Sequence, residues 1–179
     1  VLAIGRLDGG LTFHDSVKGD EIPPPKPELS SVEPRGLKIG GETQVTLKGK
    51  HLTGLTDVRT GNPKIKARLL PSDGVDGSSV RVVLEASDDL APDSYELWVA
   101  SAGGPGGAGM ESNKLKVHAE HMAQVQESEA ILTIPVSVWG TFQKSGDTDL
   151  LAFNAKAGQL IVADGAAQRL GSKAQVLLS

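Results

Sequence analysis

Between Pro34 and His118 the sequence alternates apolar and polar residues with a period of two, and turns containing glycine interrupt this pattern at short intervals. Such alternation places apolar side chains on one side of an extended strand, whereas it would scatter them around a helix. Val45 and Leu47 share one face, and Thr46 and Lys48 share the other. Strands with one polar face are typical of antiparallel sheets that cover a core on one side only. Seven runs are predicted to be strands: 29–33, 43–50, 56–60, 64–70, 79–86, 94–100 and 114–118.

These strands predict an all-β fold. Turn signals recur roughly every 8–12 residues, and seven short strands within 28–118 match the size of an immunoglobulin-like β-sandwich. Aromatic residues make up only 3% of the chain, so the core is expected to consist of Val, Leu, Ile and Ala. This composition favours packed strands over an aromatic ligand cleft.

Composition also narrows the possible chemistry. The chain has no cysteine, which excludes disulfides, thiolate catalysis and cysteine-based zinc sites. The net charge of −4 and the scattered Lys and Arg residues argue against nucleic acid or a membrane surface as a partner. No apolar run reaches the length of a membrane span, and no signal peptide is recognisable. The chain begins with Val, and we expect it to be a piece of a larger protein.

The first 27 residues read as a hairpin and a linker. Two apolar runs flank Asp8-Gly9-Gly10, which is a strong hairpin signal over residues 1–20. Gly5, Asp8, Gly9, Leu11 and Asp15 resemble the inner strands of a WD40-type propeller blade, although the Trp-Asp pair is missing. We therefore expect the remnant of an upstream domain. The four prolines of residues 21–27 favour a stiff polyproline spacer over the alternative, a ligand for SH3 or WW domains.

The central region resembles the IPT/TIG immunoglobulin-like family. The motifs are Val32-Glu-Pro-Arg-Gly36, Gly40-Gly41 before Val45-Thr-Leu-Lys-Gly49 with Leu52, and Ala91-Pro92-Asp-Ser-Tyr95 before Leu97-Trp-Val99. The resemblance covers residues 28–118 and implies an immunoglobulin-like sandwich. Two features depart from the family pattern: Asp93 stands where Gly is usual, and a Gly-rich loop occupies residues 103–109.

Residues 119–130 are polar and poorly patterned, so we expect a linker with a turn of helix at most. Beyond them the motif from Pro135 to Gln159 resembles the bacterial pre-peptidase C-terminal (PPC) domain. The resemblance implies a jelly-roll-like β module over 131–179, but the region holds only about half of such a domain. Strands are expected at 134–142, 149–154, 159–164 and 174–178. Because half a sandwich exposes an apolar face, we expect this part to be poorly ordered, domain-swapped or completed by a neighbouring chain.

Several residues are candidate metal ligands. His118 and His121 could share a metal on a helix, but the sequence favours surface histidines at a strand end, and His14 and His51 stand alone. Asp147 and Asp149 could offer oxygens to calcium. The resemblance to the PPC family implies that acidic residues of the preceding linker could take part, and Glu127 and Glu129 lie there, but the Glu-Pro-Asn pattern of that family is absent. A structural turn is the favoured interpretation of this motif, and we expect no cofactor. Asp73 and Asp76 are expected to mark a hairpin tip.

Other residues are candidates for a contact surface. The loop with Gly103, Gly104, Gly106 and Gly107 lacks the Lys-Ser/Thr of a phosphate-binding loop, so we expect a flexible connection that could touch a partner. Trp98 falls on the face opposite Leu97 and Val99, which favours contact with a neighbouring domain over a ligand platform. Tyr95 is expected at a corner with its hydroxyl bonded back to the chain. Trp139 is expected to be buried or at an edge of the C-terminal module.

No sequence motif of a catalytic site is present, and the carboxylates are scattered over turns. We therefore expect a non-catalytic array of binding or spacing modules in a large extracellular, surface-attached or periplasmic bacterial protein, with a glycan or protein ligand. The alternative is an accessory region of a secreted hydrolase, such as a protease, whose catalytic domain lies outside these residues. An intracellular DNA-binding immunoglobulin-like domain is disfavoured by the acidic balance.

Overall fold

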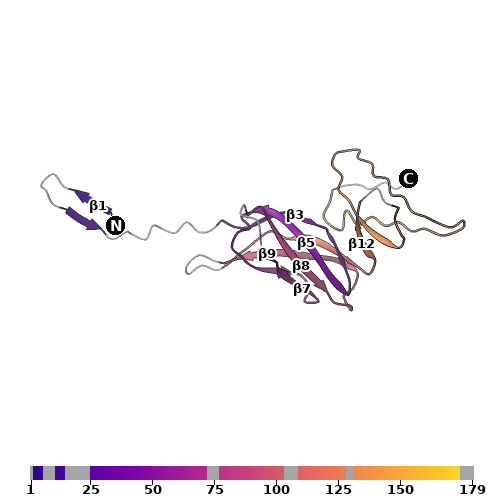
Figure 1. Cartoon of the computed structure of the whole chain (residues 1–179), viewed down its shortest axis with the longest axis horizontal. Coiled ribbons are helices and arrows are strands. Elements are labelled where there is room, and N and C mark those ends of the chain that lie inside the picture. The colour runs from indigo at the N-terminus through magenta and orange to yellow at the C-terminus, as the bar shows by residue number, and fades with distance from the viewer. Residues whose placement is uncertain are drawn as a thin grey trace.

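The structure, a computed structural model, describes residues 25–71, 77–102, 109–127 and 131–173, and the backbone of 2–5 and 11–14. Its described residues form strands and loops and contain no helix (Figure 1). None of them therefore forms an apolar helix that could cross a bilayer. The all-β prediction is confirmed. The strands are β1 Leu2–Gly5, β2 Leu11–His14, β3 Glu28–Glu33, β4 Gly36–Lys38, β5 Gly41–Lys50, β6 Leu55–Thr60, β7 Ile65–Leu69, β8 Ser79–Ala86, β9 Asp93–Ser101, β10 Met110–Glu111, β11 Leu115–Glu120, β12 Ala123–Gln126 and β13 Val136–Trp139.

Residues 28–120 form an immunoglobulin-like sandwich of two sheets. The first sheet has the order β3-β5-β8-β7, and all its pairs are antiparallel. In the second sheet β9 pairs with β6 on one side and with β10 and β11 on the other, and β4 adds to β11 in parallel. This division of strands is that of an immunoglobulin fold. All seven strands predicted in this region are present, and β4 and β10 are additional short strands.

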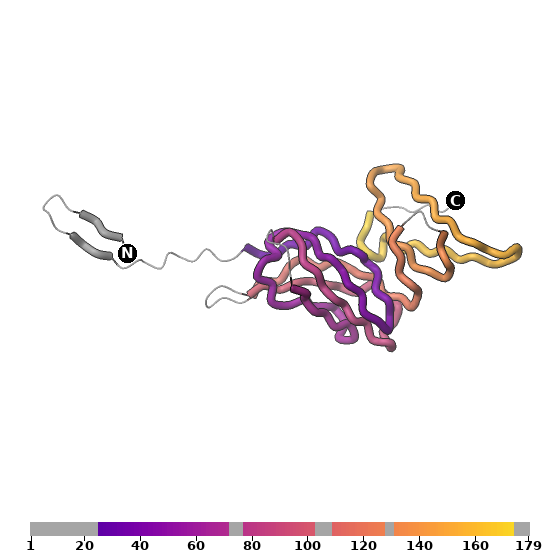
Figure 2. Tube along the Cα trace, in the orientation of Figure 1, coloured from indigo at the N-terminus to yellow at the C-terminus, as the bar shows by residue number. Residues whose placement is uncertain are grey.

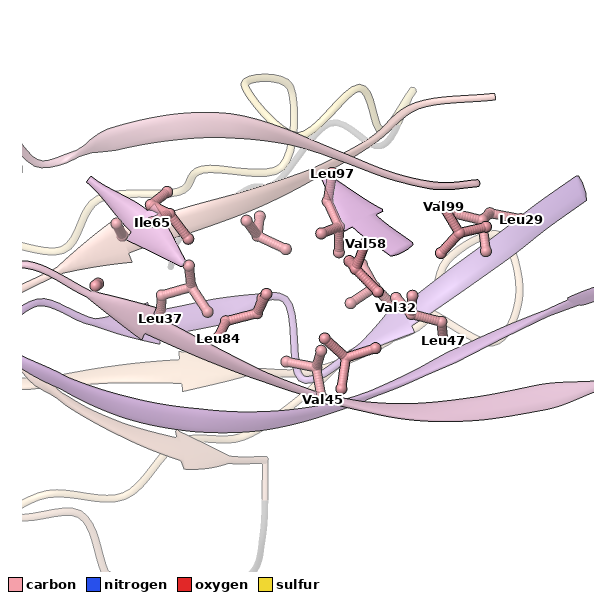
Figure 3. Packing of buried hydrophobic residues seen from close by; sticks show 14 of the residues in the cluster. Leu29, Val32, Leu37, Val45, Leu47, Val58, Ile65, Leu84, Leu97 and Val99 are labelled. Carbon is pink, nitrogen blue, oxygen red and sulfur yellow. The ribbon is translucent and has the colours of Figure 1, made fainter. Parts of the chain in front are cut away.

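Aliphatic side chains from both sheets fill the space between them. Val45 and Leu47 of β5 are completely buried, as are Leu97 and Val99 of β9. Figure 3 shows Val45 and Leu84 of one sheet facing the residues of the other. Burying one such side chain contributes about 1.5–3 kcal/mol, so these alternating residues supply most of the driving force for the sandwich. The alternation in the sequence therefore identifies the core correctly.

The chain enters the sandwich at one end, called here the proximal end. Pro27 is completely buried there, and the side chain of Asn113 bonds to the backbone of Leu29. Asn113 Oδ1 accepts from the Leu29 amide over 2.8 Å, and its Nδ2 donates to the Leu29 carbonyl over 2.9 Å. Because β3 is the edge strand of the first sheet, these two bonds tie its unpaired side to the segment between β10 and β11 and hold the first residues of the sandwich in place.

The chain leaves at the opposite end, called here the distal end. At this end β4 runs parallel to β11, with Gly36 opposite His118 and Lys38 opposite Glu120. The Ile39 amide donates to the Glu120 carbonyl over 2.8 Å. The hydroxyl of Tyr95 donates to the Ala91 carbonyl over 2.6 Å, as predicted for a corner residue. The chain therefore traverses the sandwich from one end to the other.

The N-terminal hairpin has the predicted strands. β1 and β2 pair antiparallel, with Leu2 opposite His14 and Gly5 opposite Leu11. The turn at residues 8–10 lies outside the described residues. So does the first part of the proline-rich linker, while residues 25–27 have no regular structure.

The region after Glu120 differs from the prediction in two ways. Residues 123–126, expected in a linker with a turn of helix, form strand β12, which pairs in parallel with β13. Residues 149–154 and 159–164, expected to be strands, form no ladder, and the only pairing there among described residues is one bridge between Leu132 and Phe153. The predicted strand at 174–178 lies outside the described residues. In Figure 2 the orange and yellow trace of 131–173 runs in long loops beside the sandwich.

The missing ladders leave apolar side chains in water, as expected for half of a β module. Leu150 is 90% exposed and Leu160 is 87% exposed. Every exposed large apolar side chain in the described part of the chain lies beyond Glu120, and none lies in the sandwich: Met122, Ile131, Phe142, Leu150, Leu151, Phe153, Leu160, Ile161 and Val162. Over its described residues the C-terminal module therefore leaves an apolar surface uncovered.

Candidate functional site

A buried polar network joins the distal end of the sandwich to the C-terminal module. Its centre is His118 on β11, which is only 5% exposed. Its Nδ1 lies 3.2 Å from the Ser94 hydroxyl on β9, and its Nε2 lies 3.0 Å from Oε1 of Glu120. When the ring is neutral, Nε2–H donates to the carboxylate and Nδ1 accepts from Ser94, so both ring nitrogens are satisfied.

The prediction that His118 is a surface histidine is wrong. Its place in the alternation puts it on the outer face of the sheet, but β4 lies alongside it and the C-terminal module lies against the same end. The hydroxyl of Ser137 on β13 reaches Oε1 of Glu120 over 3.5 Å. His121 and His51 are exposed, as predicted. For His14 the structure describes the backbone alone.

A second contact at this junction is made by Trp139 of β13. Its indole N–H donates to the side-chain oxygen of Gln124 on β12. Both groups lie against the backbone of Gly36, at a place where a β-carbon would collide with them. Next to Gly36, a guanidinium nitrogen of Arg35 donates to the Leu170 carbonyl over 3.4 Å. Glycine is thus required at position 36 by close approach of the next module.

Trp98 lies on the outer face of the second sheet, half-buried, while Leu97 and Val99 beside it face the core. The Lys114 ammonium lies 4.8 Å from the centre of its ring, and Arg59 is its cross-strand neighbour. Among the buried side-chain nitrogen and oxygen atoms of the described residues, only the Trp98 indole nitrogen has no hydrogen-bond partner. The role of Trp98 as a contact residue stays a prediction.

Ion pairs surround Trp98 on this face. Arg59 pairs with Asp57 at 3.0 Å and also with Glu111, and Lys114 pairs with Glu96 at 2.7 Å. All of these side chains are about half exposed, so the pairs contribute little stability. They form a polar rim around an aromatic ring, which is a surface able to contact another molecule. The glycines proposed for contact, Gly103, Gly104, Gly106 and Gly107, lie outside the described residues, as does the tip with Asp73 and Asp76.

The candidate calcium residues lie in a turn of the C-terminal module. A carboxylate oxygen of Asp147 accepts from the Gln143 amide over 2.8 Å. Asp149 lies beside Glu127, and the hydrogen bond between the two carboxyl groups raises the pKa of Glu127. Burial and the negative charge of Asp149 raise this pKa further. Within the described ranges no group of three potential ligands is arranged to hold a metal ion.

A shallow depression of about 290 Å³ lies at the proximal end, lined by Lys26, Pro27, Glu28, Leu29 and Asn113. The amide of Asn113 is already bonded to the Leu29 backbone there, so it is not free to orient a ligand. The depression lies where the first residues of the sandwich bond to Asn113, and we do not regard it as a ligand-binding site.

No family model matches the chain. No curated protein matches it either. A solved structure from Bacteroides ovatus, SGBP-B of the mixed-linkage glucan utilization locus in complex with a mixed-linkage heptasaccharide, has a distant similarity. It is 14% identical over 69% of this chain, with a TM-score of 0.35. The match spans 30% of that protein, and so distant a similarity does not bear on the fold or role of this chain.

Proposed function

We propose that this chain is a non-catalytic pair of modules that binds and spaces within a large bacterial protein of the cell surface, the extracellular space or the periplasm. The observation that carries the proposal is the junction at the distal end. The chain crosses the sandwich from end to end, and the following module is then held by Trp139 against Gly36 and by Ser137 against Glu120. A spacer needs such a fixed connection, because freely jointed modules cannot hold a defined distance.

We divide the chain into five parts: a hairpin remnant at 1–20, a proline-rich linker at 21–27, an immunoglobulin-like domain at 28–118, a connection at 119–130 and an incomplete C-terminal module at 131–179. The pairing of β12 with β13 supports joining residues 123–126 to the C-terminal module. That these parts resemble the WD40, IPT/TIG and PPC families is part of the same proposal.

Small-angle X-ray scattering and NMR relaxation of the full chain test the spacing role. Fixed spacing predicts that the sandwich and residues 123–173 tumble together, with one rotational correlation time. A Trp139→Ala variant should separate the two correlation times, whereas Arg68→Ala, on an exposed strand away from the junction, should not. Independent tumbling of the two modules in the unaltered chain would contradict the proposal.

The contact surface that we favour for a ligand is the outer face around Trp98, and glycans are the first class to test. An aromatic ring can stack on a sugar, and the rim of Arg59, Glu96 and Glu111 supplies hydrogen-bonding groups. A printed glycan array with the full chain, Trp98→Ala and the control Arg68→Ala tests this. Binding lost only in Trp98→Ala supports the assignment, and binding unaffected by Trp98→Ala places the contact elsewhere.

A further inference from the structure

The strands that carry the chain into and out of the sandwich lie next to each other and run in the same direction. The chain enters at the proximal end through β3 and continues into β4, and it leaves at the distal end through β11. The polypeptide continues on both sides, to the hairpin β1–β2 and to residues 131–173. A pull on these flanking parts would therefore draw β3 and β4 toward the proximal end and β11 toward the distal end.

Hydrogen bonds across this pair lie nearly at right angles to such a pull. The His118 amide donates to the Arg35 carbonyl over 2.7 Å, and the Ile39 amide donates to the Glu120 carbonyl over 2.8 Å. Between them Leu37 lies opposite Ala119. Sliding β11 along β4 strains all of these bonds together, whereas peeling β11 away from its end would break them one at a time.

Two further features resist sliding. Asn113, just before β11, is bonded twice to the Leu29 backbone in β3, so the proximal end of the pair is also tied. Leu37, Val117 and Ala119 are almost completely buried, which keeps water from the neighbouring backbone bonds. Water would otherwise replace a strained bond as it opens.

We propose that the sandwich is a tension-resistant link, which opposes end-to-end force by shear of β3 and β4 against β11. This inference rests on the proposed spacing role and adds to it a mechanical property. Resistance to force depends on the unfolding rate and not on equilibrium stability alone, so it is measured directly.

Single-molecule force spectroscopy of the full chain tests the inference. Because the chain has no cysteine, pairs of introduced thiols define the pulling points without background. Lys26→Cys with His121→Cys pulls the two ends of the sandwich apart in shear. Asp88→Cys with His121→Cys is the matched control, because Asp88 lies beside Gly40 at the distal end and the pull then peels β11 away. All three positions are exposed.

We expect a rupture force severalfold higher for the first pair than for the second at equal pulling speed. Equal forces, or a higher force for Asp88/His121, would overturn the inference. Adding Asn113→Ala should lower the rupture force of the first pair and leave the second unchanged. Tyr95→Phe serves as the comparison, since it removes a bond outside the β3–β4–β11 contact and should lower the shear force less than Asn113→Ala does.

The force experiment and the tumbling experiment can fail independently of each other. Common tumbling of the two modules with equal rupture forces would leave the spacing role standing and remove the mechanical one. Independent tumbling with a high shear force would remove the spacing role and leave the mechanical one, because the sandwich alone sets that force.

Discussion

The indole of Trp139 lies directly against the backbone of Gly36, which leaves no room for a side chain at position 36. The two residues belong to different modules, and Gln124 holds the indole in place through its N–H. The contact therefore fixes how the C-terminal module sits on the sandwich.

Gly36→Ala should displace β12 and β13 from the sandwich and leave the sandwich folded. A β-carbon would overlap the indole and the Gln124 amide, and such overpacking costs about 1–3 kcal/mol. The emission of Trp139, measured in a Trp98→Phe background, should shift to longer wavelength. Combining Gly36→Ala with Trp139→Ala should cost less than the sum of the single variants. Additive losses would show that the two residues do not interact.

Asn113→Ala should lower the free energy of unfolding by about 1 kcal/mol, because it removes the side chain that bonds the partly buried amide and carbonyl of Leu29. Asn113→Asp keeps the acceptor and loses the donor, so it should also destabilise. Denaturant unfolding followed by circular dichroism measures both. Wild-type stability in Asn113→Ala would mean that water replaces the side chain without cost.

Tyr95→Phe should lower the free energy of unfolding by about 0.5–1.5 kcal/mol through loss of the bond to Ala91. Burial, with the negative charge of Asp93, raises the pKa of Tyr95, so the hydroxyl stays protonated as the donor. The folded hydroxyl holds its proton more tightly than the unfolded one. Its contribution is therefore complete below the ordinary pKa of tyrosine and is lost as the pH rises through the raised value. Phe at this position should remove that alkaline dependence, which unfolding curves at several pH values would detect.

Leu47→Ala and Leu150→Ala are a matched pair that compares the two modules. Leu47 is completely buried in the sandwich, and its truncation should cost about 2–5 kcal/mol. Leu150 is 90% exposed, and the same change should alter the free energy of unfolding by less than about 0.5 kcal/mol. A large loss in Leu150→Ala would show that the C-terminal face is covered in solution.

The pKa of Glu127 should lie above its ordinary value, because the hydrogen bond to Asp149, burial and the negative charge of Asp149 all favour the protonated carboxyl. A carboxyl with a raised pKa in the folded state binds its proton more tightly there. It therefore stabilises the C-terminal turn fully below its ordinary pKa, and this contribution is lost as the pH rises through the raised value. NMR titration of the side chain measures the shift. Asp149→Asn should return the pKa of Glu127 toward the ordinary range, and an unchanged titration would contradict the pairing.

The sandwich could be predicted from the sequence because its signals are local. Val45 and Leu47 alternate with polar neighbours, and Tyr95 follows the residues of the corner, so both could be assigned without knowing their partners. Strand β4 could not be predicted, because it is short and forms only by pairing with His118 and the residues after it. The burial of His118 has the same origin, because residues from other strands cover it.

Apart from β13, the strands of the C-terminal module could not be predicted from the alternation of apolar and polar residues. Residues around Leu150 and Val162 have the composition of strands, yet a strand needs a hydrogen-bonded neighbour along its length. The described residues offer only the single bridge between Leu132 and Phe153. β12 was missed for the opposite reason, since its polar sequence gives no alternation and its partner β13 defines it. The contact role of Trp98 stays a prediction.

The parallel pairing of β4 with β11 also sets the order of events during synthesis. Leu37 emerges from the ribosome early, but its neighbour Ala119 is among the last residues of the domain to appear. The nascent sandwich cannot close this edge until its final strand is released, so Leu37 stays accessible to chaperones until that strand has emerged. Ribosome-bound chains that end before residue 115 should consequently remain sensitive to protease, and chains long enough to release Glu120 should become protected.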